Sequence, residues 1–197
     1  MKKIVVRDDG EGIARDDMPF VAKEHATSKI RKIEDISSIA TYGFRGEALS
    51  SIASISELTI ISRKRDEELG TKLISKGGNC DLVDYAGPPG CTVIAENLFF
   101  NFPARKKFLR SPSHELRSIK DVFYKISIAC PNISFRLTVD GKSQSVLPEV
   151  ASLRDRIVQI HGDAVARHLI EGELRDLRAS ISGLVSGAAF HRPNRSL

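Results

Sequence analysis

The segment Gly43-Phe44-Arg45-Gly46-Glu47-Ala48-Leu49 constrains this chain more than any other part of its sequence. Its two glycines flank an aromatic residue and an arginine, and Leu49, Ile52 and Ala53 then recur at helical spacing. Free backbone N–H groups at the start of a helix bind anions, and the helix dipole strengthens the attraction. The segment therefore predicts a loop that closes over phosphates. The plainer alternative is a tight connection into a helix.

A second glycine-containing turn follows a short apolar run near the start of the sequence. Residues 3–8 predict a β-strand that ends at Asp8, and Gly10 and Gly12 follow within the turn. A carboxylate fixed there can accept a hydrogen bond from an exocyclic amine such as that of adenine, and glycines let the backbone approach a flat ring. The simpler alternative is an ordinary turn, for which Asp-Gly is common.

Four further polar residues could complete a nucleotide site. Thr27, Ser28 and Lys29 could donate hydrogen bonds to phosphate oxygens. Thr92, at the predicted start of a strand, could place its hydroxyl beside Asp8 in an adenine pocket. Taken alone, the first three are better explained as a solvated loop, and Thr92 by the general preference of threonine for strands.

The charge balance favours polyanionic partners weakly, because 30 Lys and Arg outweigh 25 Asp and Glu to give a net charge of +5. Four cations gather at the start of a predicted helix, namely Arg105, Lys106, Lys107 and Arg110. They could contact a nucleic-acid backbone, with Phe108 and Leu109 holding the helix to the core. A solvated helix face is the alternative.

Cysteine usage and hydropathy predict a cytoplasmic protein. Cys80, Cys91 and Cys130 are odd in number and widely spaced, so neither a disulfide framework nor a zinc site is expected. No histidine lies at metal-binding spacing from another ligand, so a metal site of protein ligands alone is not expected. The apolar run Ile4–Val6 is too short for a signal peptide or a membrane span, and no membrane partner is expected.

Periodicity predicts an α+β fold in which an antiparallel sheet packs on helices. Strands are expected at 58–62, near Leu73, at 92–96 and across 133–139, the last ended by an Asp140-Gly141 hairpin turn. Helices are expected at 15–25, 33–39, 103–108 and 116–126. Beyond Pro148 a helical stripe at 153–160 ends at Gly162 and a strand follows at 178–185, so two domains are predicted, 1–148 and 149–197.

Four motifs in one order resemble the MutL family of DNA mismatch-repair ATPases, within the GHKL superfamily. They are Asp-x-Gly-x-Gly at 8–12, His-Ala-Thr-Ser-Lys at 25–29, Gly-Phe-Arg-Gly-Glu-Ala-Leu at 43–49 and Asn-x-Pro-Ala-Arg at 101–105. The resemblance is dense over residues 5–110 and weaker beyond. It implies a Bergerat-type α/β sandwich, incomplete here, followed by the start of a ribosomal-protein-like transducer domain near residue 149.

The resemblance also implies an ATP site and a set of partners. Asp8 would contact adenine, Gly10 and Gly12 would shape the ring pocket, and Thr92 would back the ring. The phosphates would be bound by Thr27, Ser28, Lys29 and the backbone of Gly43 to Leu49. Family members dimerise on ATP binding, bind DNA and couple a MutS-type mismatch-recognition protein to excision. In a prokaryote the protein would be associated with the nucleoid.

One family motif has no match in these 197 residues. It is a helix with the pattern Glu-x-x-x-Asn-x-x-Asp-Ala that carries the general base and the Mg²⁺-binding Asn, and it would lie before Met1. The chain is therefore expected to be a fragment, truncated at both ends, with at most weak nucleotide binding and no measurable ATP turnover alone. Robust Mg²⁺-dependent hydrolysis would contradict this expectation.

Two other interpretations stay open. One is a naturally shortened, non-catalytic module that binds DNA or a partner protein. The other is an unrelated nucleotide-binding α+β domain.

Overall fold

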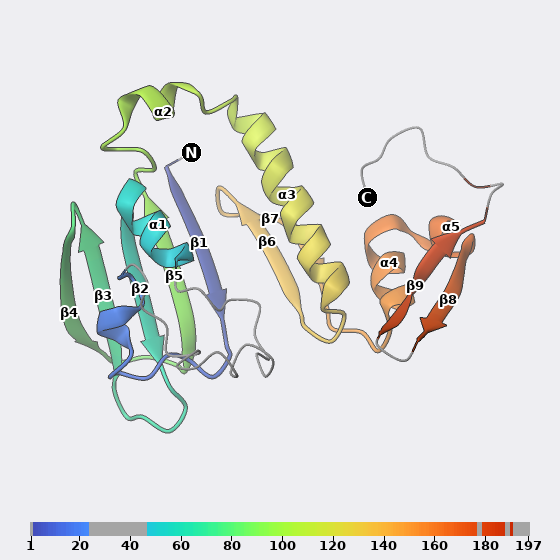
Figure 1. Ribbon diagram of the computed structural model, residues 1–197, viewed down its shortest axis with the longest axis horizontal. Coiled ribbons are helices and arrows are strands. Elements are labelled where there is room, and N and C mark those ends of the chain that lie inside the picture. The colour runs from blue at the N-terminus through green and yellow to red at the C-terminus, as the bar shows by residue number, and fades with distance from the viewer. Residues whose placement is uncertain (1, 24–46, 177–178, 188–189, 191–197) are drawn as a thin grey trace. The chain divides into compact units, whose positions relative to one another are not determined.

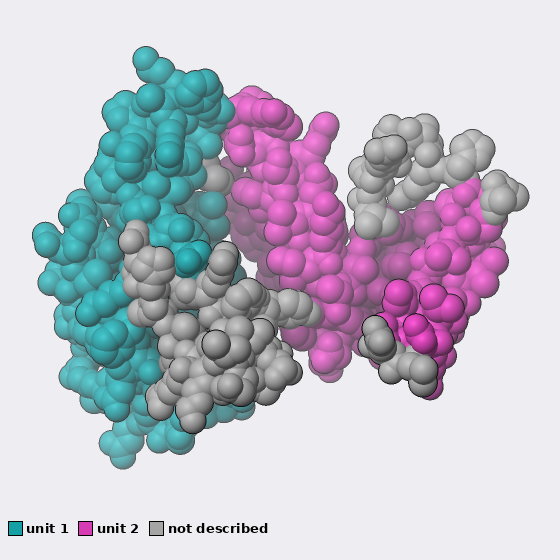
Figure 2. Space-filling view, in the orientation of Figure 1, with its two compact units in different colours: residues 1–109 teal, residues 110–197 magenta. Residues whose placement is uncertain are grey.

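The computed structural model describes residues 2–23, 47–176, 179–187 and 190. The chain divides into two compact units, residues 1–109 and 110–197, which Figure 2 shows in teal and magenta. The predicted helix at 33–39 lies outside the described residues. The predicted domain boundary near residue 148 falls inside the second unit and stays a prediction.

The first unit is built on a five-stranded antiparallel sheet with the order β1-β5-β2-β3-β4. Its strands are β1 (Lys3–Asp8), β2 (Glu57–Arg63), β3 (Gly70–Lys76), β4 (Asn79–Tyr85) and β5 (Gly90–Glu96). The strands predicted at 3–8, 58–62, 92–96 and near Leu73 are confirmed. Strand β4 was not predicted, because as an edge strand it is exposed on both faces and shows no alternation of apolar and polar residues.

The core of this unit lies on one face of the sheet. Burial alternates along β2, so that Leu58 and Ile60 are fully buried together with Leu73 of β3 and Met18. Helix α1 (Ala48–Ile55) lies over this face, as Figure 1 shows, and packs on the core through Leu49, Ile52 and Ala53. The predicted helix after Gly46 is confirmed.

The helix predicted from Arg15 to His25 is wrong for the described part of that range. Only the 3-10 helix η1 (Met18–Phe20) forms, within successive turns closed by i→i−3 hydrogen bonds such as Lys23 N–H to Phe20 O at 3.0 Å. Pro19 has no N–H to donate and Asp16 and Asp17 favour turns over helix interiors, so an α-helical ladder is not sustained here.

Helix α2 (Pro103–Lys107) completes the first unit and begins at Pro103 as predicted. The second unit contains α3 (Pro112–Ala129), β6 (Phe135–Val139), β7 (Lys142–Leu147), α4 (Leu153–His161), α5 (Asp163–Ala166), β8 (Leu169–Arg175) and β9 (Ser180–Ser186). Its strands form two antiparallel hairpins, β6–β7 and β8–β9. None of the helices in the described ranges is long and apolar enough to cross a membrane.

Turn chemistry in the second unit follows the sequence closely. Asp140 and Gly141 both have positive φ, +48° and +76°, as the two-residue turn of the β6–β7 hairpin requires. Gly162, with φ +81°, ends α4. At the other end of α4, the Ser152 hydroxyl accepts a hydrogen bond from the Asp155 N–H at 3.1 Å and caps the helix.

A buried arginine connects α4 to the segment that follows α3. Arg156 is fully buried, and its Nη2 donates to the carbonyl oxygens of Pro131 at 2.8 Å and Ile133 at 2.6 Å. Its Nη1 donates to Gln159 Oε1 at 2.7 Å. These bonds occupy both terminal nitrogens of the guanidinium, whereas its buried Nε has no hydrogen-bond partner among the described residues.

Candidate functional site

The turn after β1 presents a carboxylate at one end of the sheet. Asp8 is the last residue of β1 and is exposed. Its Oδ1 accepts a hydrogen bond from the Gly10 N–H at 3.0 Å, and Oδ2 has no hydrogen-bond partner among the described residues. An ionised carboxylate has several acceptor positions, so the turn fixes the side chain and leaves acceptor capacity for a ligand.

Two glycines let this turn lie directly against neighbouring strands. A Cβ at Gly12, where φ is +79°, would be 2.2 Å from the carbonyl oxygen of Arg63. A Cβ at Gly90, where φ is +112°, would be 2.3 Å from the carbonyl oxygen of Asp8. Only glycine fits at these positions, because a side chain would both clash and adopt a disfavoured backbone conformation. The backbone contact accounts for Gly12, whereas its predicted role beside a ring stays a prediction.

The hydroxyl of Ser62 ties the turn to the sheet. Ser62 is 1% exposed, its Oγ accepts the Ile13 N–H at 2.8 Å, and its hydroxyl donates to the carbonyl oxygen of Gly90 at 2.9 Å. On the exposed side, Arg65 Nη2 donates to the Asp9 carbonyl oxygen at 3.0 Å. Sequence reasoning missed Ser62, because a single serine within a strand carries no motif.

Strand register places Cys91 rather than Thr92 beside Asp8. Asp8 pairs with Cys91, and Cys91 also pairs with Ser62 on its other side. Thr92 pairs with Arg7. Directly paired residues share a face of the sheet and neighbours along a strand alternate, so Thr92 points to the opposite face. The predicted position of Thr92 beside Asp8 is therefore wrong, and the shift of one residue explains the error.

The pKa of the Cys91 thiol depends on burial and on Asp8 and Ser62, the residues with which Cys91 pairs. Burial raises the pKa of this thiol above its ordinary value, the negative charge of Asp8 raises it further, and the interaction with Ser62 partly opposes the rise. Cys91 is therefore a neutral, half-buried group at physiological pH. A small side chain with one weak donor stands where the sequence predicted a threonine hydroxyl.

The start of α1 points toward the end of the sheet at which Asp8 lies. Only Ser56 separates α1 from β2, and the helix runs back along this strand, so that its first residues approach the end where β2 finishes (Figure 1). The Glu47 carbonyl oxygen accepts the Ser51 N–H at 3.0 Å and begins the helical ladder. Of the predicted phosphate-binding residues, Glu47, Ala48 and Leu49 are described. Those outside the described residues are Thr27, Ser28, Lys29, Gly43, Phe44, Arg45 and Gly46.

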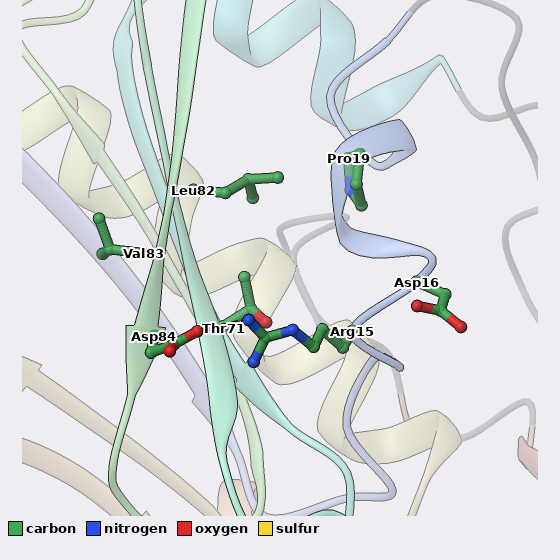
Figure 3. A pocket seen from close by; sticks show the side chains of 7 residues that line it. All are labelled: Arg15, Asp16, Pro19, Thr71, Leu82, Val83 and Asp84. Atoms are coloured by element: carbon green, nitrogen blue, oxygen red, sulfur yellow. Dashed lines mark hydrogen bonds and ion pairs between the residues drawn. The ribbon is translucent and has the colours of Figure 1, made fainter.

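A separate hollow of about 300 Å³ lies on the other edge of the sheet, between residues 15–19 and strands β3 and β4. Figure 3 shows that Pro19 and Leu82 point into it while Val83 points away. Arg15 Nη2 approaches Asp84 Oδ1 to 2.6 Å at its rim. Both side chains are more than half exposed, so this pair contributes little stability. None of the predicted site residues lines this hollow.

The four basic residues predicted to contact nucleic acid are exposed, but they are divided between the two units. Arg105, Lys106 and Lys107 lie on α2 and form no ion pair within the described residues, and the Arg105 guanidinium lies 5.1 Å from the Phe102 ring centroid. Arg110 is the first residue of the second unit. Phe108 is 83% exposed, so the prediction that it holds the helix to the core is wrong. Helix α2 ends at Lys107, and Phe108 follows as its exposed C-cap.

Comparisons with known proteins agree with this architecture. Residues 1–77 match the family described as histidine kinase-, DNA gyrase B-, and HSP90-like ATPase. Over all 197 residues the chain is 42% identical to the DNA mismatch repair protein MutL of Streptococcus pneumoniae serotype 19F strain G54. It is equally similar to HexB of S. pneumoniae serotype 4 strain TIGR4. The chain spans 30% of the length of these curated relatives.

Solved structures extend the likeness to the fold. The N-terminal domain of a DNA repair protein aligns with 96% of this chain and 61% of its own, at 28% identity and a TM-score of 0.72. The Aquifex aeolicus MutL ATPase domain complexed with ADP aligns with 94% of this chain and 65% of its own, at 25% identity and a TM-score of 0.66. The chain is thus a homologue of MutL and HexB over its full length and has the GHKL ATPase fold.

Proposed function

We propose that this chain binds an adenine nucleotide at the Asp8 turn, as the nucleotide-binding part of a MutL-type DNA mismatch repair protein. The observation that carries the proposal is the geometry of Asp8. One carboxylate oxygen is fixed by the Gly10 N–H while the other is available, and the turn is held against β2 and β5 by glycines that admit no side chain. The related Aquifex aeolicus MutL ATPase domain was solved with ADP.

In this proposal Asp8 accepts a hydrogen bond from the exocyclic amine of adenine. Guanine carries a carbonyl oxygen at the corresponding position, which would face the carboxylate and be repelled. Gly10 and Gly12 let the ring approach the backbone, and Cys91 takes the place predicted for Thr92 beside Asp8. A carboxylate acceptor of this kind makes the site selective for adenine over guanine.

The phosphates are proposed to bind Thr27, Ser28, Lys29 and the segment from Gly43 to Leu49, at the start of α1. Peptide N–H groups at a helix start favour anions, which gives the described end of this segment the right polarity. The family implies Mg²⁺ together with ATP. The described residues contain no group of three or more acidic, histidine or cysteine side chains that could hold a metal ion, so no Mg²⁺ ligand is assigned in this chain.

Calorimetric titration of the 197-residue chain with ADP tests the proposal. Asp8→Asn keeps an acceptor for the Gly10 N–H but replaces the charged acceptor, and we expect ADP affinity to fall at least about tenfold. Asp81→Asn, at an exposed position on β4, is the matched control and should leave affinity unchanged. Absence of ADP binding to the wild-type chain, or equal binding by Asp8→Asn, would refute the proposal.

For the whole protein we propose a role in DNA mismatch repair within the cytoplasm, with DNA, a MutS-type mismatch-recognition protein and a second copy of the chain as partners. The support is the likeness to DNA mismatch repair proteins MutL and HexB, which are 42% identical to this chain over its 197 residues. We also propose that residues 1–148 form the ATP-binding domain and residues 149–197 begin the transducer domain.

The exposed cations of α2 favour a DNA-binding role. Arg105, Lys106 and Lys107 have no ion-pair partner within the described residues, so they can neutralise phosphates without breaking existing contacts. Replacing all three with Ala should weaken binding to duplex DNA and flatten its salt dependence. The matched control replaces one arginine and two lysines that are exposed in the second unit, namely Arg136, Lys125 and Lys142. Equal salt slopes for the two triple variants would contradict this role.

A further inference from the structure

Three backbone segments meet at the end of β2, and one side chain joins them. The segments are the turn after β1, the last residues of β2 and the first residues of β5. Ser62 is the next-to-last residue of β2 and is 1% exposed. Its hydroxyl oxygen therefore lies away from bulk water, which strengthens the hydrogen bonds that it makes.

The Ser62 hydroxyl accepts a hydrogen bond from one backbone segment and donates one to another. Its Oγ accepts the Ile13 N–H at 2.8 Å, and its hydrogen goes to the carbonyl oxygen of Gly90 at 2.9 Å. Ile13 directly follows the turn, and Gly90 directly precedes Cys91. A single oxygen atom thus fixes both the exit of the Asp8 turn and the start of the strand that faces Asp8.

The remaining contacts leave little freedom for another arrangement. The Gly12 backbone lies against the Arg63 carbonyl, and the Gly90 backbone lies against the Asp8 carbonyl. The other side-chain bonds to the backbone of residues 9–13, within the described part of the chain, come from Asp8 and Arg65 and are exposed to water. Among the described residues, Ser62 therefore supplies the only side-chain bond to the turn that is partly shielded from water.

We infer that Ser62 is a positioning residue for the nucleotide site. It sets the conformation of the Asp8 turn and through that turn the preference for adenine, and this inference rests on the proposed function. Ser62 itself touches the turn and β5, and it acts on the nucleotide through Asp8. Losing the hydroxyl leaves the Ile13 N–H unpaired and lets the turn move relative to Cys91.

Ser62→Ala, Ser62→Thr and Ser75→Ala in the 197-residue chain test the inference. Ser75 is 4% exposed in β3 and has no side-chain hydrogen bond among the described residues, so its variant controls for the loss of a buried hydroxyl. Calorimetry measures ADP and GDP affinities, and hydrogen exchange measures the amides of residues 9–14 without nucleotide.

We expect Ser62→Ala to lower ADP affinity about tenfold and to reduce the ADP-over-GDP preference. Exchange of residues 9–14 should accelerate at the same time. Ser75→Ala should change neither quantity. Ser62→Thr keeps the hydroxyl and should restore affinity, preference and exchange protection.

Unchanged exchange and affinity in Ser62→Ala would overturn the inference, and so would equal losses in Ser62→Ala and Ser62→Thr, since these indicate packing volume as the cause. A wild-type chain that binds no ADP refutes the proposed function instead. In that case the exchange of residues 9–14 alone decides whether Ser62 sets the turn.

Discussion

Replacing Gly12 with Ala would test the packing of the turn against β2. The new Cβ would lie 2.2 Å from the Arg63 carbonyl oxygen, whereas ordinary contacts begin at 3.4 Å, so the turn would have to move by about 1 Å. Overpacking of this kind costs about 1–3 kcal/mol. The positive φ of +79° adds about 1–2 kcal/mol for a residue with a side chain. The free energy of unfolding should therefore fall by about 2–5 kcal/mol.

Gly78→Ala is the matched control, because Gly78 lies in the same unit, has φ +90° and has nothing within 4 Å of a Cβ. It should cost only about 1–2 kcal/mol for its φ. The entropy that Ala removes from the unfolded chain is the same in both variants and cancels in the comparison. Urea denaturation followed by circular dichroism gives both values. A difference below about 0.5 kcal/mol would refute the close contact between Gly12 and Arg63.

Three further predictions concern other parts of the chain. Arg156→Leu should lower the free energy of unfolding of the second unit by about 2–4 kcal/mol in urea denaturation, because two carbonyl oxygens lose their buried donor. The exposed control Arg175→Ala should cost less than about 0.5 kcal/mol, and equal effects would contradict this. Ser152→Ala should cost about 1 kcal/mol through loss of the α4 cap, and a thermal melt that matches wild type would count against the cap. Because the pKa of Cys91 is raised, its neutral thiol stabilises the fold below the ordinary thiol pKa and this contribution is lost as pH rises through the raised value. Asp8→Asn should lower that pKa and speed iodoacetamide alkylation of Cys91 at pH 8, with Cys80 and Cys130 unchanged; equal Cys91 rates would show that Asp8 does not act on this thiol.

Periodic burial explains which elements the sequence predicted. Strand β2 buries every second residue and α1 packs three apolar residues at helical spacing, so both leave a pattern that the sequence alone reveals. Strand β4 is exposed at the sheet edge and leaves none. The segment 15–23 has apolar residues at plausible spacing, but Pro19 and two aspartates oppose a helix, and local turn chemistry prevails there.

Sequence motifs indicated the turn residues of the candidate site. The residues whose place depends on strand register were not predicted correctly. Asp8 and Gly12 stand out because turns need particular residues. Thr92 was placed on the wrong face, because a shift of one residue along a strand reverses the direction of every side chain. Ser62 and Cys91 come from strands distant in sequence from Asp8, and only the pairing of β1, β5 and β2 brings the three together.

The first measurement is whether ADP protects Cys91 from alkylation, because this thiol lies beside Asp8 and would be covered by a nucleotide bound there. Mass spectrometry reports the three cysteines of one sample separately, so Cys80 and Cys130 serve as internal controls. Saturating ADP should slow iodoacetamide modification of Cys91 alone, and GDP at the same concentration should protect Cys91 less. Equal rates at Cys91 with and without ADP would contradict the proposed nucleotide site.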